Sequence, residues 1–122
     1  MFRLILTFLI VLLFTLPVRA GDLDGKALLC TSNSNSTYPV YGLVFDKGKV
    51  TKWLVMGYSK VTDYTFSYNL IGTDYVHWRS ARTYLNRQSL TFNEDQCSVS
   101  SKAGIFQKLD QIIAAAKKKN KI

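Results

Sequence analysis

The stretch DYVHWRSARTYLNRQSL, which starts at Asp74, holds the only histidine of the chain among arginines, tyrosines and serines. A serine or cysteine nucleophile needs a histidine within reach and an acid that orients the histidine. If the stretch begins as a strand, His77 shares a face with Tyr75 and Arg79, whereas Asp74 and Ser80 point to the other face. The local sequence therefore supplies no catalytic triad.

Other catalytic signatures are missing from the sequence. It has no G-x-S-x-G elbow that would expose a serine, and no glycine-rich loop that would hold a phosphate. Glu94 and Asp95 are neighbours in an expected turn, where water keeps both ionised, so they do not form the separated carboxylate pair of a glycosidase. Two cysteines and one distant histidine do not make a zinc site. We therefore expect a non-enzymatic protein without metal or cofactor; the less favoured alternative is a small hydrolase with a site assembled around His77.

The same stretch is better suited to binding. Arginines pair with carboxylates and phosphates through two hydrogen bonds, and aromatic rings offer stacking surfaces. The alternative is that these side chains only cover the solvent face of a sheet. We expect a module that binds a protein or a small anionic or carbohydrate ligand, such as an envelope protein-binding or inhibitor domain, through Tyr75, His77, Arg79, Arg82, Tyr84 and Arg87.

The first twenty residues have the pattern of a secretory signal peptide. Arg3 precedes an apolar run over residues 4–16, which ends at Pro17 and a small residue, Ala20. The run is shorter than the roughly 20 residues of a membrane-spanning helix. We expect cleavage after Ala20 and a periplasmic or secreted single domain over residues 21–122; an uncleaved anchor is the alternative.

Export bears on the two cysteines, Cys30 and Cys97. An oxidising compartment favours a disulfide between them, which would join the first expected strand to the last. The alternative is a pair of buried thiols.

The formal charge of +8 is concentrated outside the body of the domain. Arg3 and Arg19 belong to the expected signal, which leaves +6, and four C-terminal lysines account for +4 of that, so residues 21–116 carry only +2. A body so close to neutrality lacks the broad cationic face that nucleic acid requires. The C-terminal lysines are either a solvated helix end or a peripheral contact with an anionic membrane surface, and they are Lys117, Lys118, Lys119 and Lys121.

Short strands are expected over most of residues 26–100. The clearest signal is the alternation of aromatic or apolar with polar side chains over residues 64–71. Turn residues separate the other runs, and the last strand is expected to carry Cys97 and Val99 inward. A polar loop over residues 31–39 contains Asn35, which matches the glycosylation acceptor pattern and matters only in a host with that machinery. The remaining strands are expected over residues 26–31, 40–45, 50–58, 75–79, near 85, 90–92 and 96–100.

The pattern changes to a helical period over residues 101–119. Ser101 is a suitable N-cap, and one apolar stripe follows it, formed by Ile105, Phe106, Leu109, Ile112 and Ile113. We expect the stripe to pack on the sheet or across a barrel mouth; a membrane surface or a partner groove is the alternative. The predicted fold is mainly β, a small antiparallel barrel or sandwich of seven to eight strands with a C-terminal amphipathic helix.

A leader, an early Cys30 in ALLCTS, a late Cys97 in DQCSV and strands between them form a layout that resembles the small secreted β-barrels that inhibit c-type lysozyme. That family uses a serine-glycine loop with a following tyrosine and a tryptophan-lysine-glycine motif, neither of which is present here, so no inhibitory residue carries over. The pattern LDGKALLC, VHW, LNRQSLTF and QCSV is also similar to short exported bacterial proteins of uncharacterised function. Both resemblances imply one compact β domain and add no activity.

Overall fold

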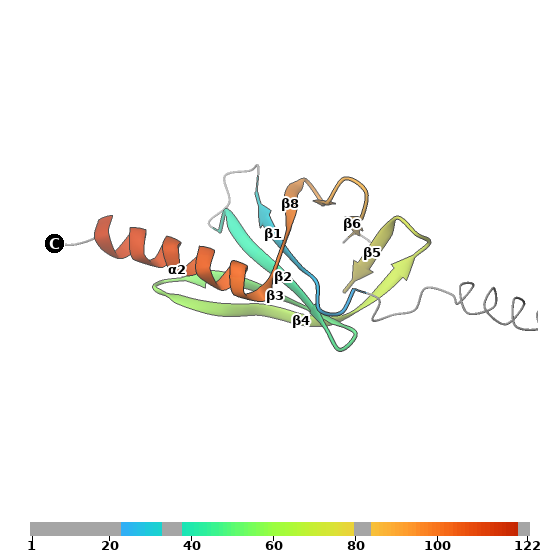
Figure 1. Ribbon diagram of the computed structural model, residues 1–122, viewed down its shortest axis with the longest axis horizontal. Coiled ribbons are helices and arrows are strands. Elements are labelled where there is room, and N and C mark those ends of the chain that lie inside the picture. Colours follow the sequence, from blue (N-terminus) through green and yellow to red (C-terminus); the bar gives the residue numbers. More distant parts are fainter. Residues whose placement is uncertain (1–22, 33–37, 80–83, 120–122) are drawn as a thin grey trace, which may run out of the picture.

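The computed structural model describes residues 23–32, 38–79 and 84–119 (Figure 1). The expected signal peptide, Asn35, Arg82 and Lys121 lie outside these residues. The elements are β1 (Ala27–Thr31), β2 (Val40–Asp46), β3 (Lys49–Met56), β4 (Ser59–Ile71), β5 (Tyr75–Trp78), β6 (Tyr84–Asn86), β7 (Thr91–Phe92), β8 (Asp95–Ser100) and α2 (Lys102–Lys119).

The strands form a closed antiparallel barrel in which each strand pairs with the next one along the chain. The last strand, β8, pairs with β1 and closes the wall. This confirms the predicted fold class and decides between its two forms, since a sandwich would leave two separate sheets. Closure also removes the unpaired outer edges that an open sheet would expose.

Alternation along the strands separates the interior of the barrel from its outer wall. In β1, Leu28 and Cys30 are buried inside with the main core, whereas Ala27 packs in a second cluster on the outside. Trp78 and Phe92 stack inside the barrel with ring centroids 4.9 Å apart. The period of two that the sequence shows is therefore the inside–outside pattern of a filled small barrel.

The wall is uneven because its strands differ greatly in length. β4 has 13 residues and pairs along the whole of β3, with an irregularity between Lys52 and Trp53. By contrast, β7 has only two residues and contacts β8 through Gln96 and Asp95. The β3–β4 hairpin extends past the barrel on one side, while β6 and β7 close the other side with few backbone pairs (Figure 1).

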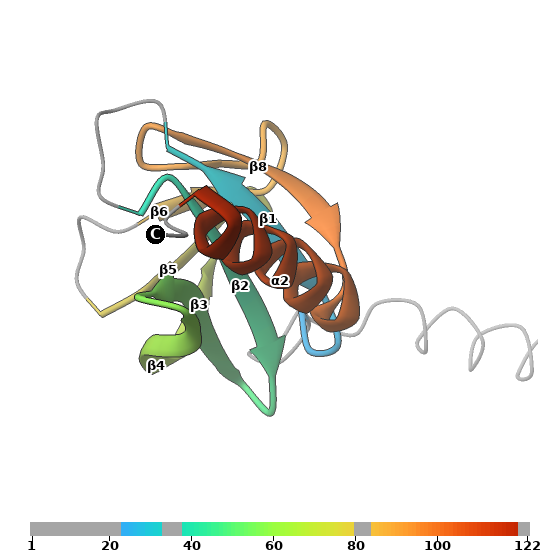
Figure 2. The same ribbon diagram turned by 90° about the vertical axis from the view of Figure 1, so that its left-hand side faces the viewer.

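The C-terminal helix packs on the outside of the barrel, across β1 to β4 (Figure 2). The Ser101 hydroxyl accepts a hydrogen bond from the Gly104 amide at 2.9 Å, which confirms the predicted N-cap. Ile105 and Leu109 are fully buried, and Phe106 meets Trp53 edge to face at 4.8 Å between centroids. The stripe therefore packs on the sheet rather than across a barrel mouth.

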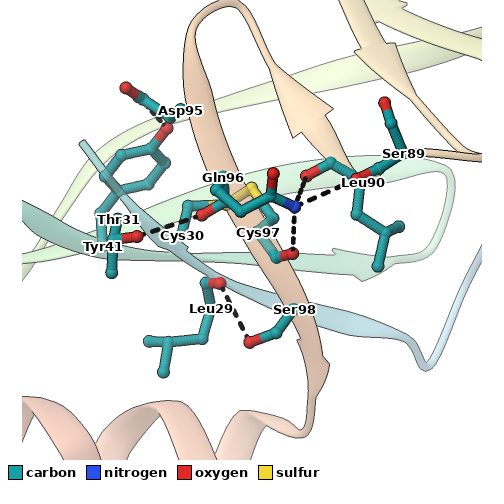
Figure 3. Close-up of a disulfide and its surroundings, with 10 residues drawn as sticks. All are labelled: Leu29, Cys30, Thr31, Tyr41, Ser89, Leu90, Asp95, Gln96, Cys97 and Ser98. Carbon is teal, nitrogen blue, oxygen red and sulfur yellow. Dashed lines mark hydrogen bonds between the residues drawn. A yellow bond between two sulfur atoms is a disulfide. The ribbon is translucent and has the colours of Figure 1, made fainter. Parts of the chain in front are cut away.

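A disulfide joins Cys30 to Cys97 across β1 and β8, as the sequence predicts (Figure 3). The two residues lie directly opposite each other, with their Cα atoms 4.0 Å apart. The Gln96 side-chain amide beside them donates to the backbone oxygens of Ser89 and Cys97, which ties the β6–β7 turn to β8. A disulfide is typical of an oxidising, exported location.

Two expectations about the strands are wrong. The run over residues 50–58 is not one strand, since the chain turns at Gly57, whose φ is +64°, and β4 already begins at Ser59. Val99 is in phase with Cys97 but is 75% exposed rather than buried. It lies beyond the pair of Thr91 with Gln96, where the two-residue β7 no longer runs beside β8 and only β1 pairs with it.

We expect Gly42→Ala to destabilise the fold, because a Cβ atom there would lie 2.4 Å from Ile105 Cγ2. Overpacking of this kind costs about 1–3 kcal/mol in the free energy of unfolding, measured by urea titration. The control is the same substitution in an Ile105→Ala background, where the cost should shrink because the clashing atoms are gone. An equal cost in both backgrounds would contradict the proposed clash.

Candidate ligand-binding surface

Three of the six predicted binding residues come together on the outer face of β5 and β6. His77 lies directly opposite Tyr84, and their rings stack 6.0 Å apart with an interplanar angle of 19°. Tyr75 meets Tyr84 edge to face, with centroids 6.3 Å apart. We call Tyr75, His77 and Tyr84 the three-ring patch.

The patch is open to solvent but internally packed. Tyr75 is 43% exposed and Tyr84 38%, and Ile71, the strand partner of Tyr75, adds an apolar side chain that is 41% exposed. The Nδ1 atom of His77 is buried and makes no hydrogen bond with any described residue. Stacking on Tyr84, rather than hydrogen bonding through Nδ1, is thus what the structure shows holding the imidazole.

The arginines do not join the patch. Arg79 has a φ of +70°, which turns the chain just after β5, and its guanidinium carbon lies 5.5 Å from the centroid of Phe66. Phe66 packs against the main core, so this side chain covers the barrel rather than the patch. Arg87 lines a hollow with Leu85 and Leu90 at the edge of the barrel. Arg82 lies outside the described residues.

A second polar cluster, which the sequence analysis did not identify, lies on the inner side of β2, β3 and β4. The Tyr41 hydroxyl donates to Asp95 Oδ2 at 2.5 Å, and the Trp78 indole N–H donates to the Tyr64 hydroxyl at 3.1 Å. The Lys52 ammonium lies 4.5 Å from the Tyr41 ring centroid and 5.7 Å from that of Tyr64.

A signal for this cluster is visible in the sequence. Lys52 alternates in phase with Val50 and Leu54, both of which are buried, so a lysine stands where an apolar side chain is expected. Its ammonium is also 3.5 Å from Asp63 Oδ2. The inner position is tolerated because two ring faces and one carboxylate surround the charge.

Both tyrosines of this cluster have raised pKa values. Burial is the main cause for Tyr41, and the hydrogen bond to Asp95 raises its pKa further. Burial also raises the pKa of Tyr64, against the opposing effect of the hydrogen bond from Trp78. Both phenols therefore stay protonated at neutral pH and act as hydrogen-bonding groups rather than as phenolate bases.

Compared with known proteins, the chain matches no family model, no curated protein and no solved structure. The resemblance to lysozyme inhibitors and to short exported proteins therefore stays a prediction. Within residues 23–32, 38–79 and 84–119, no three His, Cys, Asp or Glu side chains gather as metal ligands. In the same part of the chain, no helix has the length and apolarity needed to cross a bilayer.

We expect the free energy of unfolding to fall above about pH 10, because Tyr41 and Tyr64 hold their protons more tightly in the folded state than in the unfolded chain. Their contribution is complete at lower pH. Tyr41→Phe should reduce this slope by at most about 1.4 kcal/mol per pH unit. It should also cost about 1 kcal/mol at neutral pH through the lost hydrogen bond to Asp95.

The measurement is urea unfolding at about pH 7, 9 and 11, on either side of the ordinary tyrosine pKa. Tyr58→Phe is the control, since Tyr58 is 48% exposed and lies in the β3–β4 turn. A Tyr41→Phe variant with an unchanged alkaline slope would show that Tyr41 does not hold its proton in this way.

Proposed function

We propose that the protein is an exported, non-enzymatic binding module that holds a protein partner through the three-ring patch. The observation that supports this most is the contact between two exposed tyrosines and a histidine on adjacent strands, with exposed Ile71 beside them. Tyrosine is enriched at protein interfaces because it offers a large contact area and a hydroxyl at a small entropic cost.

The geometry favours a protein over a small anion at this surface. Arg79 and Arg87 have their side chains elsewhere, on Phe66 and in the hollow beside Leu85. Within the described residues, the patch thus presents ring edges, ring faces and hydroxyl groups without an arginine fork. Such a surface suits an apolar side chain and a few hydrogen bonds from a folded partner better than a carboxylate or phosphate.

The proposed location is the periplasm or the exterior of the cell. The disulfide supports an oxidising compartment. Residues 1–20 support the same location through the sequence pattern of a secretory signal.

We expect the double variant Tyr75→Ala/Tyr84→Ala to lose at least about 90% of its specific partner in affinity capture from the exported fraction, since central aromatic contacts each contribute about 2 kcal/mol or more. Quantitative mass spectrometry of the bound proteins provides the measurement. Circular dichroism and thermal unfolding check that the fold persists.

The matched control is Tyr58→Ala, which removes a tyrosine of similar exposure, 48%, from the β3–β4 turn. This variant should retain the partner. Equal retention by all variants, or equal loss with Tyr58→Ala, would remove the three-ring patch as the binding surface.

A second candidate function is contact with an anionic membrane surface, which one arrangement supports. The β3–β4 turn exposes Met56 (51%) and Tyr58 (48%). It extends beyond the barrel at the same end as the C-terminal part of α2 (Figures 1 and 2). The last turn of α2 carries three exposed lysines, Lys117, Lys118 and Lys119.

If this contact exists, neutralising the three lysines to glutamine should weaken partitioning onto vesicles that contain phosphatidylserine, because each lysine near such a surface contributes about 1 kcal/mol. Co-sedimentation measures the partitioning. The control removes the same charge from exposed Lys26, Lys47 and Lys49. Equal partitioning of both triple variants and the unmodified chain would exclude a specific role for the lysine end.

A further inference from the structure

A hollow of about 210 Å³ lies beside the shortest strands of the barrel wall, between β1, β8 and the β6–β7 turn. Its lining is mostly apolar, and the side chains come from six separate places in the fold. The apolar lining residues are Leu23, Ala27, Leu28, Phe45, Leu85, Leu90 and Val99.

The hollow exists because the strands next to it are short. β7 begins only at Thr91, which pairs with Gln96, so β8 beyond Cys97 has no β7 residue beside it and pairs with β1 alone. Val99 is therefore in phase with the core but 75% exposed, and it forms one wall of the hollow. Buried Phe45 and Leu85 form other parts of the lining.

Leu90 forms another wall of the hollow, and its backbone has an unfavourable conformation. Its φ of +56° lies in the left-handed region, which costs a leucine about 1 kcal/mol or more. The turn holds it there, since the Leu90 amide donates to the Asn86 carbonyl at 2.8 Å and its own carbonyl accepts from the Cys97 amide at 2.8 Å. A leucine held in this conformation keeps an apolar side chain at the hollow before any ligand arrives.

The polar groups of the hollow are cationic. Lys26 and Arg87 are the charged residues among its described lining. Asp24, the nearest acid in the sequence to Lys26, accepts hydrogen bonds from Gly48 and Tyr68. An apolar hollow with a lysine and an arginine among its lining matches a ligand with an apolar chain and one anionic head.

We propose that this hollow binds a medium-chain monocarboxylate, with its alkyl chain among Leu28, Leu90 and Val99 and its carboxylate at Lys26 and Arg87. The volume is consistent with this size. A dry cavity of about 150 Å³ accepts benzene, so one somewhat larger holds a chain of about six to eight carbons. The site is separate from the three-ring patch, with which it shares no residue.

The test is a titration of the full chain with sodium octanoate, followed by NMR of methyl groups. Saturable shifts are expected for the methyls of Leu28, Leu90 and Val99. Octanamide, which has the same chain without the charge, should bind about tenfold more weakly, because a charge-assisted contact is lost. The double variant Lys26→Gln/Arg87→Gln should reduce octanoate binding to the level of octanamide and leave octanamide binding unchanged.

Two further variants keep the test independent of folding defects. Val99→Trp places a ring in the hollow from an exposed position and should abolish binding of both compounds. Lys49→Gln removes an exposed charge at the β2–β3 turn and should change neither. Absence of saturable shifts, equal affinity for octanoate and octanamide, or an unchanged octanoate affinity in Lys26→Gln/Arg87→Gln would each overturn the proposal.

Discussion

The pairing of the first strand with the last is the constraint on which the rest of the barrel depends. β1 and β8 are separated by most of the chain, and the disulfide fixes their register at Cys30 opposite Cys97. Closing a loop of 67 residues in this way lowers the conformational entropy of the unfolded chain and so stabilises the fold by about 4 kcal/mol. This is a large share of the stability of a small domain. The same register positions Ser100 opposite Ala27, so α2 begins beside β1 and its buried residues meet the outer wall there.

Unequal strand lengths then give the two sides of the wall different properties. The long β3–β4 pair provides a broad outer surface, and α2 covers part of it through Ile105, Leu109 and Phe106. The short β6 and β7 close the barrel with few hydrogen bonds, which leaves Val99 uncovered and opens the hollow beside Leu90. The three-ring patch and the hollow both border β6, which carries Tyr84 of the patch and Leu85 of the hollow and has few backbone pairs with β5 and β7.

Features with a regular period were predictable from the sequence, whereas local backbone geometry was not. The alternation around Tyr68, the helical stripe around Leu109 and the Ser101 cap all lie where the pattern placed them. The turn at Gly57 was missed because Met56 and Tyr58 continue an apolar run on either side of it. Strand alternation predicts Arg79 on the same face as His77. Its positive φ, which non-glycine residues seldom adopt, turns the chain there, and the side chain lies over Phe66 instead. His77 and its tyrosines did come together, because cross-strand register alone determines their contact.

The three-ring patch and the lysine end of α2 differ in how firmly their side chains are held, and this gives the two surfaces different roles. The rings of the three-ring patch are fixed by strand register and by one another, so a partner that binds them orders few side chains and gains short-range specificity. Lys117, Lys118 and Lys119 are exposed on the last turn of α2, and long solvated side chains of this kind act mainly through long-range attraction that salt weakens. A partner or a bilayer that carries negative charge would therefore be attracted through the helix end, whereas selection among partners depends on the fit to Tyr75, His77 and Tyr84. Affinity that falls steeply with ionic strength therefore belongs to the lysine end of α2, and affinity that salt leaves intact belongs to the three-ring patch.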